Sequence, residues 1–257
     1  HLLALADGMG GHVGGDVASS TVIAGLVALD GEALSGRDLS EALLDRILSA
    51  NADIGQEVRA EPRLDGMGTT LIAMLRSGDK IVLAHIGDSR AFLVRDGVVT
   101  QVTKDHSFVQ TLVDAGRITA EEAQTHPQRS LVTRVLTGAV EDEPDLVVRQ
   151  GRFGDRYLLA SDGLTDYVAR DTIDEVLTTT GDDIAPVQRE IGLGRRWQLT
   201  VAHRQDVVIN AQIARIRGGG EALHQVREQV VLLQHLLEEV LRLITPLVRR
   251  AKQVVGA

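Results

Sequence analysis

The sequence has no cysteine, and Phe, Trp and Tyr together make up only 2% of its 257 residues. The absence of cysteine excludes disulfides, thiolate metal sites and cysteine nucleophiles, which leaves carboxylate, hydroxyl and imidazole chemistry. The scarcity of aromatic residues argues against a site that stacks bases. The net charge of -9 also disfavours nucleic acid as a partner.

Long apolar runs are missing as well. No stretch approaches the roughly 18 apolar residues that span a bilayer, and the amino end lacks the basic flank and cleavage site of a signal peptide. We therefore expect no membrane partner and a cytoplasmic location. Hydrophobic residues still make up 44% of the chain, which is enough to build a core.

A short apolar run opens the chain and ends at Asp7, which is followed by three glycines within four residues. The same pattern recurs where apolar runs end near Asp88 and Asp162, each beside a glycine. One aspartate beside glycine is typical of a turn, but three at the ends of apolar runs favour a shared site. Carboxylates without cysteine suit Mg²⁺ or Mn²⁺. Two such ions can activate water for the hydrolysis of a phosphate ester.

The order of predicted elements favours an α+β fold. Hydrophobic spacing predicts helices over residues 13–29 and 171–179. Between them it predicts a helix that is capped by Asp38 or Ser40 and ends at about residue 59. Short β-rich runs separated by glycine turns predict an antiparallel meander over 67–102 and further strands at 146–148 and 157–160. Residues 104–137 resemble a partly helical insertion, with a helix start at Thr119. Because no parallel unit surrounds Asp7-Gly8-Met9-Gly10, this loop is not interpreted as a dinucleotide fingerprint.

The sequence divides into three regions. Residues 1–183 carry the strand and helix patterns above, and residues 184–220 are rich in arginine with no clear period. Residues 221–257 keep a 3,4 apolar spacing that predicts an amphipathic helix. That helix either supports self-association through residues 221–255 or covers the sheet of its own domain.

Six short motifs occur in a fixed order along residues 1–183. They are Asp7-Gly8-Met9-Gly10-Gly11-His12, Met67-Gly68-Thr69-Thr70, Gly87-Asp88-Ser89-Arg90, Asp105-His106-Ser107, Leu136-Thr137-Gly138 and Ser161-Asp162-Gly163-Leu164. This order resembles the type 2C metal-dependent serine/threonine protein phosphatases. The insertion around residues 113–130 is similar to the bacterial branch, especially its actinobacterial members.

The resemblance implies a four-layer sandwich of two antiparallel β-sheets flanked by α-helices, with the active site at one edge. It also implies two Mn²⁺ or Mg²⁺ ions bridged by Asp7, with the Gly8 carbonyl as a further ligand. Asp162 would either bind one of these ions directly or hold one of its ligands, and Asp88 would help to bind a third ion. Water between the metals would be the nucleophile. Phosphorylated proteins would be the partners, together with the serine/threonine kinases that produce them.

Other residues keep two interpretations. His12 suits a general acid for the leaving oxygen, or it makes a structural hydrogen bond in its loop. Arg90 either pairs with a carboxylate or contacts phosphate, and Arg129 with Ser130 are candidates for substrate contact. We expect His106 to anchor a loop, and Thr69 and Thr70 to pack or cap rather than react.

Two departures from the family pattern keep other functions open. The arginine-bearing strand that the family places before Asp7 does not precede it in this sequence, and the final Gly-Asp-Asn motif has no match after residue 184. Asp206 is the nearest substitute for that last aspartate. The alternatives are a catalytically degenerate scaffold that acts as a binding or oligomerising module, and a sugar or nucleotide phosphatase with the same metal centre.

Overall fold

The structure, a computed structural model, describes residues 2–30, 38–166, 168–179 and 199–202, all within one compact unit of the chain. Its strands are β1 (Leu2–Leu5), β2 (Gly8–Met9), β3 (Gly68–Thr69), β4 (Leu71–Ser77), β5 (Lys80–Ile86), β6 (Arg90–Arg95), β7 (Val98–Gln101), β8 (Asp145–Gln150), β9 (Arg156–Ala160) and β10 (Leu199–Ala202). Its helices are α1 (Gly11–Val27), α2 (Leu39–Ala60), α3 (Phe108–Asp114), α4 (Ala120–Gln124), α5 (Asp162–Thr165) and α6 (Arg170–Thr179), with a 3-10 turn at Pro62–Leu64.

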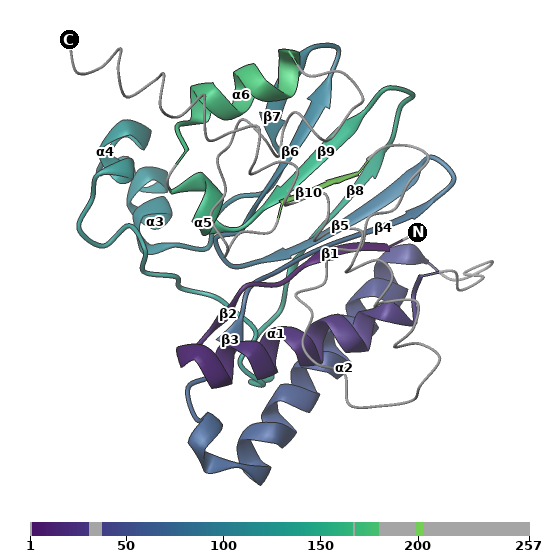
Figure 1. The fold of residues 1–257 in the computed structure, drawn as a ribbon, viewed down its shortest axis with the longest axis vertical. Helices are drawn as coiled ribbons and strands as arrows, with labels where there is room; N and C mark the ends of the chain where they lie inside the picture. The colour runs from purple at the N-terminus through teal and green to yellow at the C-terminus, as the bar shows by residue number, and fades with distance from the viewer. Residues whose placement is uncertain (1, 31–37, 167, 180–198, 203–257) are drawn as a thin grey trace, which may run out of the picture. The chain divides into compact units, whose positions relative to one another are not determined.

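Two four-stranded antiparallel sheets form the centre of this unit (Figure 1). The first has the order β1-β4-β5-β8, and the second has the order β10-β9-β6-β7. A separate two-stranded pair joins β2 to β3, with Gly8 opposite Thr69. The strands predicted over residues 67–102 are present, but they do not form one meander. Strands β4 and β5 form a hairpin at Gly78 and β6 and β7 form another at Gly97, while the chain passes from the first sheet to the second between β5 and β6.

The side-chain alternation along the first sheet produces two cores. On β1, Leu2 and Ala4 pack with α1 and α2, whereas Leu3 and Leu5 pack with the second sheet. Strand β4 divides its residues in the same way, with Leu75 on the helical side. A strand buried on both faces needs apolar residues at successive positions, which explains the unbroken apolar run over residues 71–75 of β4.

Helices complete the four layers. Helices α1 and α2 lie along the outer face of the first sheet (Figure 1), and the fully buried Leu43, Ile47 and Ile54 of α2 join that core. Helix α6 lies beside β7, and the Arg170 guanidinium sits 5.0 Å from the centre of the Phe92 ring in the second sheet. The predicted four-layer α+β sandwich is therefore confirmed.

Several local predictions are also confirmed. The Asp38 carboxylate caps α2 by accepting a hydrogen bond from the Ser40 amide at 2.7 Å. Thr119 and Glu122 form a reciprocal capping box at the start of α4, inside the predicted insertion. No helix in the described part of the chain combines the length and hydropathy needed to cross a bilayer. The amphipathic helix predicted over residues 221–257 lies outside the described residues.

Three short elements differ from the sequence prediction. Gly8 and Met9, expected only as a loop, pair with β3, and a short helix, α5, follows β9 directly. Strand β10 pairs with β9 in a region for which we predicted no structure. Elements of two to four residues have too few positions to show a period, so pairing with distant segments determines them.

Candidate metal centre

Asp7 lies in the turn between β1 and β2, and neighbouring threonines hold its backbone. Its amide donates to Thr70 Oγ1 at 3.1 Å, while its carbonyl accepts from the Thr70 amide at 2.9 Å and from Thr69 Oγ1 at 3.0 Å. Both threonines are buried. The prediction that they pack and cap within the sheet is confirmed, and their contacts fix the backbone from which the Asp7 carboxylate projects.

Asp88 and Asp162 follow the ends of two other strands. Asp88 lies between β5 and β6, and Asp162 is the first residue of α5, two residues beyond β9. Strands β1 and β5 belong to the first sheet and β9 to the second. Aspartates from both sheets therefore lie close enough for their charges to act on one another.

Burial and neighbouring carboxylates raise the pKa values of Asp7 and Asp88. Burial, the charge of Asp162 and a hydrogen bond with the Asp162 carboxyl raise the pKa of Asp7 to about 6, against a smaller opposing hydrogen bond from Ser161. Burial, followed by the charges of Asp162, Asp105 and Asp7, raises the pKa of Asp88 to about 7. Buried carboxylates that repel one another are stabilised by a cation.

Asp166 belongs to the same negative region, although its sequence pattern did not suggest it. Its amide donates to the Asp162 carbonyl at 2.7 Å, and burial together with the Asp162 charge raises its pKa. The positive charges of Arg90 and Arg129 oppose that rise. The spacing of four residues from Asp162, which puts both on one side of a helical turn, is the signal that would have identified Asp166.

Arg90 pairs with a carboxylate, so the first of its two interpretations is confirmed. Its Nε and Nη2 atoms donate to Asp105 at distances of 2.6 to 3.1 Å, and Asp105 is buried. Gln101 donates to the same carboxylate at 3.2 Å. A guanidinium that is hydrogen-bonded through two nitrogens is fixed in place. Arg90 therefore stabilises the structure beside Asp88 through its contact with Asp105.

Other predicted residues differ in how far the structure describes them. His12 lies in the first turn of α1, but its side chain is not among those that the structure describes. Asp206 lies outside the described residues. Arg129 and Ser130 are exposed on the insertion. The prediction that His106 anchors a loop is confirmed, because both its backbone and its ring contact Gly87.

The donor set suits Mg²⁺ or Mn²⁺ but does not complete their coordination. Within the described ranges, no three histidine, aspartate or glutamate side chains converge closely enough to hold one ion. Mg²⁺ usually keeps several waters and takes only one or two carboxylates from the protein. Asp7, Asp88 and Asp162, with backbone carbonyls such as that of Gly8, therefore fit hydrated ions held partly by water.

A cavity of about 450 Å³ lies at the far end of the second sheet, where Arg95 ends β6. Two of its three arginines bond to groups within the chain: Arg95 donates to Asp155 at 2.6 and 2.8 Å, and Arg156 donates to the Leu177 carbonyl at 2.7 Å. Arg90, beside Asp88, begins the same strand. The cavity is thus separated from the carboxylates by the length of β6.

This chain is similar to proteins of a known family. The family model for protein phosphatase 2C matches residues 1–191. The chain is 58% identical over 176 residues to the serine/threonine protein phosphatase PstP of Mycobacterium tuberculosis. That match covers 68% of this chain but 34% of the relative, so the chain spans about a third of that protein's length.

Solved structures agree with the fold described above. The crystal structure of the M. tuberculosis phosphatase PstP/Ppp superposes with a TM-score of 0.70 at 54% identity, covering 74% of this chain and 79% of that one. A second crystal structure, of the PstP catalytic domain in complex with two manganese ions, gives a TM-score of 0.69 at 51% identity. It covers 78% of this chain and 85% of that one.

Proposed function

Because this chain belongs to the protein phosphatase 2C family, we propose that it hydrolyses phosphoserine and phosphothreonine on proteins in a reaction that requires Mn²⁺ or Mg²⁺. The observation that carries this proposal is the grouping of Asp7, Asp88 and Asp162 within electrostatic reach of one another. Such a half-buried negative group binds cations, and cations stabilise a phosphoryl group at its reaction centre.

We assign separate roles to the three aspartates. Asp7 and the Gly8 carbonyl would hold two ions, Asp162 would help to hold one of them, and Asp88 would hold a third. Asp7 suits the bridging role because the hydrogen bonds from Thr69 and Thr70 already fix its backbone. Little conformational freedom is then lost when its carboxylate takes up two ions.

The bound ions would lower the pKa of a water molecule between them and polarise the phosphoryl oxygens. The chain's own contribution is to hold the carboxylates in place. Asp7 and Asp88, whose pKa values are raised without a cation, release their protons as ions bind. His12 donates a proton to the serine or threonine oxygen as that oxygen leaves phosphorus.

Substrate recognition is assigned to the insertion over residues 104–137. Arg129 is exposed there, and its positive charge acts on Asp166 beside Asp162. A guanidinium at the rim of a negative metal site attracts a phosphorylated segment without being a metal ligand. The partners would be proteins phosphorylated by serine/threonine kinases, and these kinases supply the substrates.

The proposal is tested by hydrolysis of a phosphothreonine peptide in the presence and absence of Mn²⁺. We expect turnover by the wild-type chain with Mn²⁺, none with a chelator, and loss of turnover in Asp7→Asn. Asp53→Asn is the matched control, since it makes the same change in charge on an exposed carboxylate of α2. Equal activity in Asp7→Asn and Asp53→Asn would reject the role of Asp7.

Two further outcomes separate the alternatives. Wild-type chain that binds Mn²⁺ in calorimetry yet turns over no phosphate ester would support a catalytically degenerate scaffold. Faster turnover of a sugar phosphate or a nucleotide than of the phosphopeptide would support a small-molecule phosphatase. Preference for the phosphopeptide supports the assignment to protein substrates.

A further inference from the structure

Gly87, the residue before Asp88, has both of its backbone polar groups bound by a single histidine. Its amide donates to His106 Nδ1 at 3.1 Å, and its carbonyl accepts from the His106 amide at 2.8 Å. Gly87 has a φ of 111°, and an added Cβ would lie 2.6 Å from the Thr70 Cβ. The turn that precedes Asp88 thus needs glycine. Because glycine has more backbone conformational freedom than other residues, contacts with other residues must hold this turn in place.

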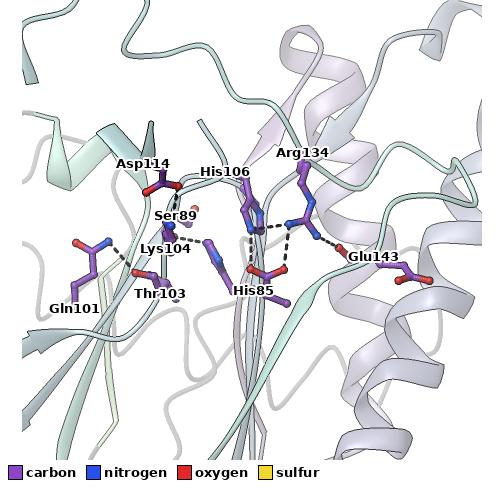
Figure 2. Close-up of polar contacts among 11 residues, drawn as sticks. His85, Ser89, Gln101, Thr103, Lys104, His106, Asp114, Arg134 and Glu143 are labelled. Atoms are coloured by element: carbon purple, nitrogen blue, oxygen red, sulfur yellow. Dashed lines mark hydrogen bonds and ion pairs between the residues drawn. The ribbon is translucent and has the colours of Figure 1, made fainter. Parts of the chain in front are cut away.

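The ring of His106 is itself oriented by two charged residues. Because Nδ1 accepts the Gly87 N–H, the neutral ring carries its proton on Nε2, which donates to Asp145 Oδ2 at 3.0 Å. Arg134 Nη1 donates to the other Asp145 oxygen at 3.1 Å, and Figure 2 shows Arg134 beside His106. Arg134 Nη1 also lies 3.0 Å from His106 Nε2. Because Nε2 carries the ring proton, it cannot accept a hydrogen bond from Arg134. The guanidinium therefore holds the carboxylate, and the carboxylate holds the ring.

The residue after Asp88 is restrained in a similar way. The buried His85 donates from Nε2 to the Ser89 carbonyl at 2.9 Å, and the Ser89 hydroxyl hydrogen-bonds the Thr70 hydroxyl at 2.9 Å. The rings of His85 and His106 lie 4.9 Å apart. Asp88 is therefore flanked on both sides by backbone that buried groups hold in place.

We infer that His106 is a positioning residue for Asp88, which it serves through the Gly87 backbone without touching a metal ion. The inference rests on the proposed metal centre. Residues that orient metal ligands from outside the coordination sphere contribute about 10- to 100-fold to metal affinity. The acceptor Nδ1 is the atom that matters, and Asp145 with Arg134 keeps that atom facing the Gly87 amide.

Two substitutions at position 106 separate the two edges of the ring. In His106→Asn the side-chain oxygen occupies the place of Nδ1, so the Gly87 contact is retained and the Asp145 contact is lost. In His106→Gln the terminal amide reaches the place of Nε2, so the Asp145 contact is retained and the Gly87 contact is lost. We expect Mn²⁺ affinity to fall about 10-fold or more in His106→Gln and by less than about threefold in His106→Asn.

A matched control comes from a second histidine with the same type of contact. His126 Nδ1 accepts from the Gln128 amide at 3.1 Å inside the insertion. His126→Gln removes this contact and should leave Mn²⁺ affinity unchanged. Unfolding followed by circular dichroism in chelator reports the stability of each variant separately from its metal affinity.

The test is calorimetric Mn²⁺ titration of the wild-type chain and the variants, with the Asp88→Asn background added. If His106 acts through Asp88, His106→Gln causes no further loss of affinity once Asp88 is Asn. Should His106→Gln fail to fold, Asp145→Ala, which frees the ring at a half-exposed carboxylate, must lower Mn²⁺ affinity about threefold or more.

Equal affinities in His106→Gln and His106→Asn, or additive losses with Asp88→Asn, would overturn the inference. Unchanged affinity in Asp145→Ala would do the same where it is the variant that folds. Wild-type chain that binds no Mn²⁺ would instead refute the proposed function, so the two failures are distinguishable.

Discussion

Gly15 of α1 packs directly against the backbone of Gly8 on β2. A Cβ added at Gly15 would lie 2.7 Å from the Gly8 carbonyl carbon and 2.8 Å from its oxygen. Real Cβ atoms do not approach backbone so closely, so any side chain at position 15 must push β2 away from the helix. The Gly8 carbonyl, which is a proposed metal ligand, can thus keep its position only if residue 15 has no side chain.

We predict that Gly15→Ala destabilises the protein by about 1–3 kcal/mol, as overpacking does. The loss should appear even though alanine favours a helix interior over glycine by roughly 1 kcal/mol. Urea unfolding measures it, and Mn²⁺ titration should show weaker binding. Gly14→Ala is the control, because its Cβ would meet the Met67 side chain at 3.0 Å and no closer backbone. Equal effects at both positions would contradict the packing explanation.

The raised pKa values of Asp7 and Asp88 predict that Mn²⁺ affinity increases with pH. Below pKa values of about 6 and about 7 these carboxyls carry protons, which an ion must displace. Affinity should therefore rise by about tenfold per pH unit for each displaced proton, and it should level off once pH exceeds the pKa of Asp88. Calorimetry in buffers of different ionisation enthalpy measures the proton release directly. A pH-independent affinity across this window would show that the carboxylates are already ionised.

The sheets and their helices could be predicted because their pattern is local. Alternating and unbroken apolar runs identified β4 to β9, and spacing of three and four identified α1, α2 and α6. Strands β2 and β3 escaped prediction because their pairing joins segments about 60 residues apart. Two residues contain no period, so only the tertiary structure selects their conformation.

The candidate site was predictable to a similar extent and for the same reason. Asp7, Asp88 and Asp162 each follow an apolar run, which the sequence displays directly. The hydrogen bonds between Thr70 and Ser89 and between Gly87 and His106 each join residues 19 positions apart. No local pattern encodes such pairs, so the groups that hold the aspartates in place became visible only in the structure.

Arg90 provides a prediction that separates support from substrate binding. Lysine cannot reproduce the two-nitrogen contact with Asp105, so Arg90→Lys should lower the free energy of unfolding by about 1–3 kcal/mol. The KM for a phosphopeptide should stay within about twofold of wild type, since the guanidinium is already engaged by Asp105. Denaturant unfolding and steady-state kinetics test the two halves. A large rise in KM with unchanged stability would mean that Arg90 contacts phosphate instead.

Arg129 is expected to show the opposite behaviour, because it is exposed on the insertion and its charge reaches Asp166. Arg129→Ala should raise the KM for a phosphopeptide by about 3- to 10-fold with little change in stability, as loss of an exposed attractive charge does. Steady-state kinetics at two salt concentrations measures this effect, which should shrink at high salt because screening weakens the wild-type attraction. Arg117→Ala removes an equally exposed arginine from the same insertion and serves as the matched control. If both variants raise KM equally, the effect belongs to the overall charge of the insertion and not to a contact made by Arg129.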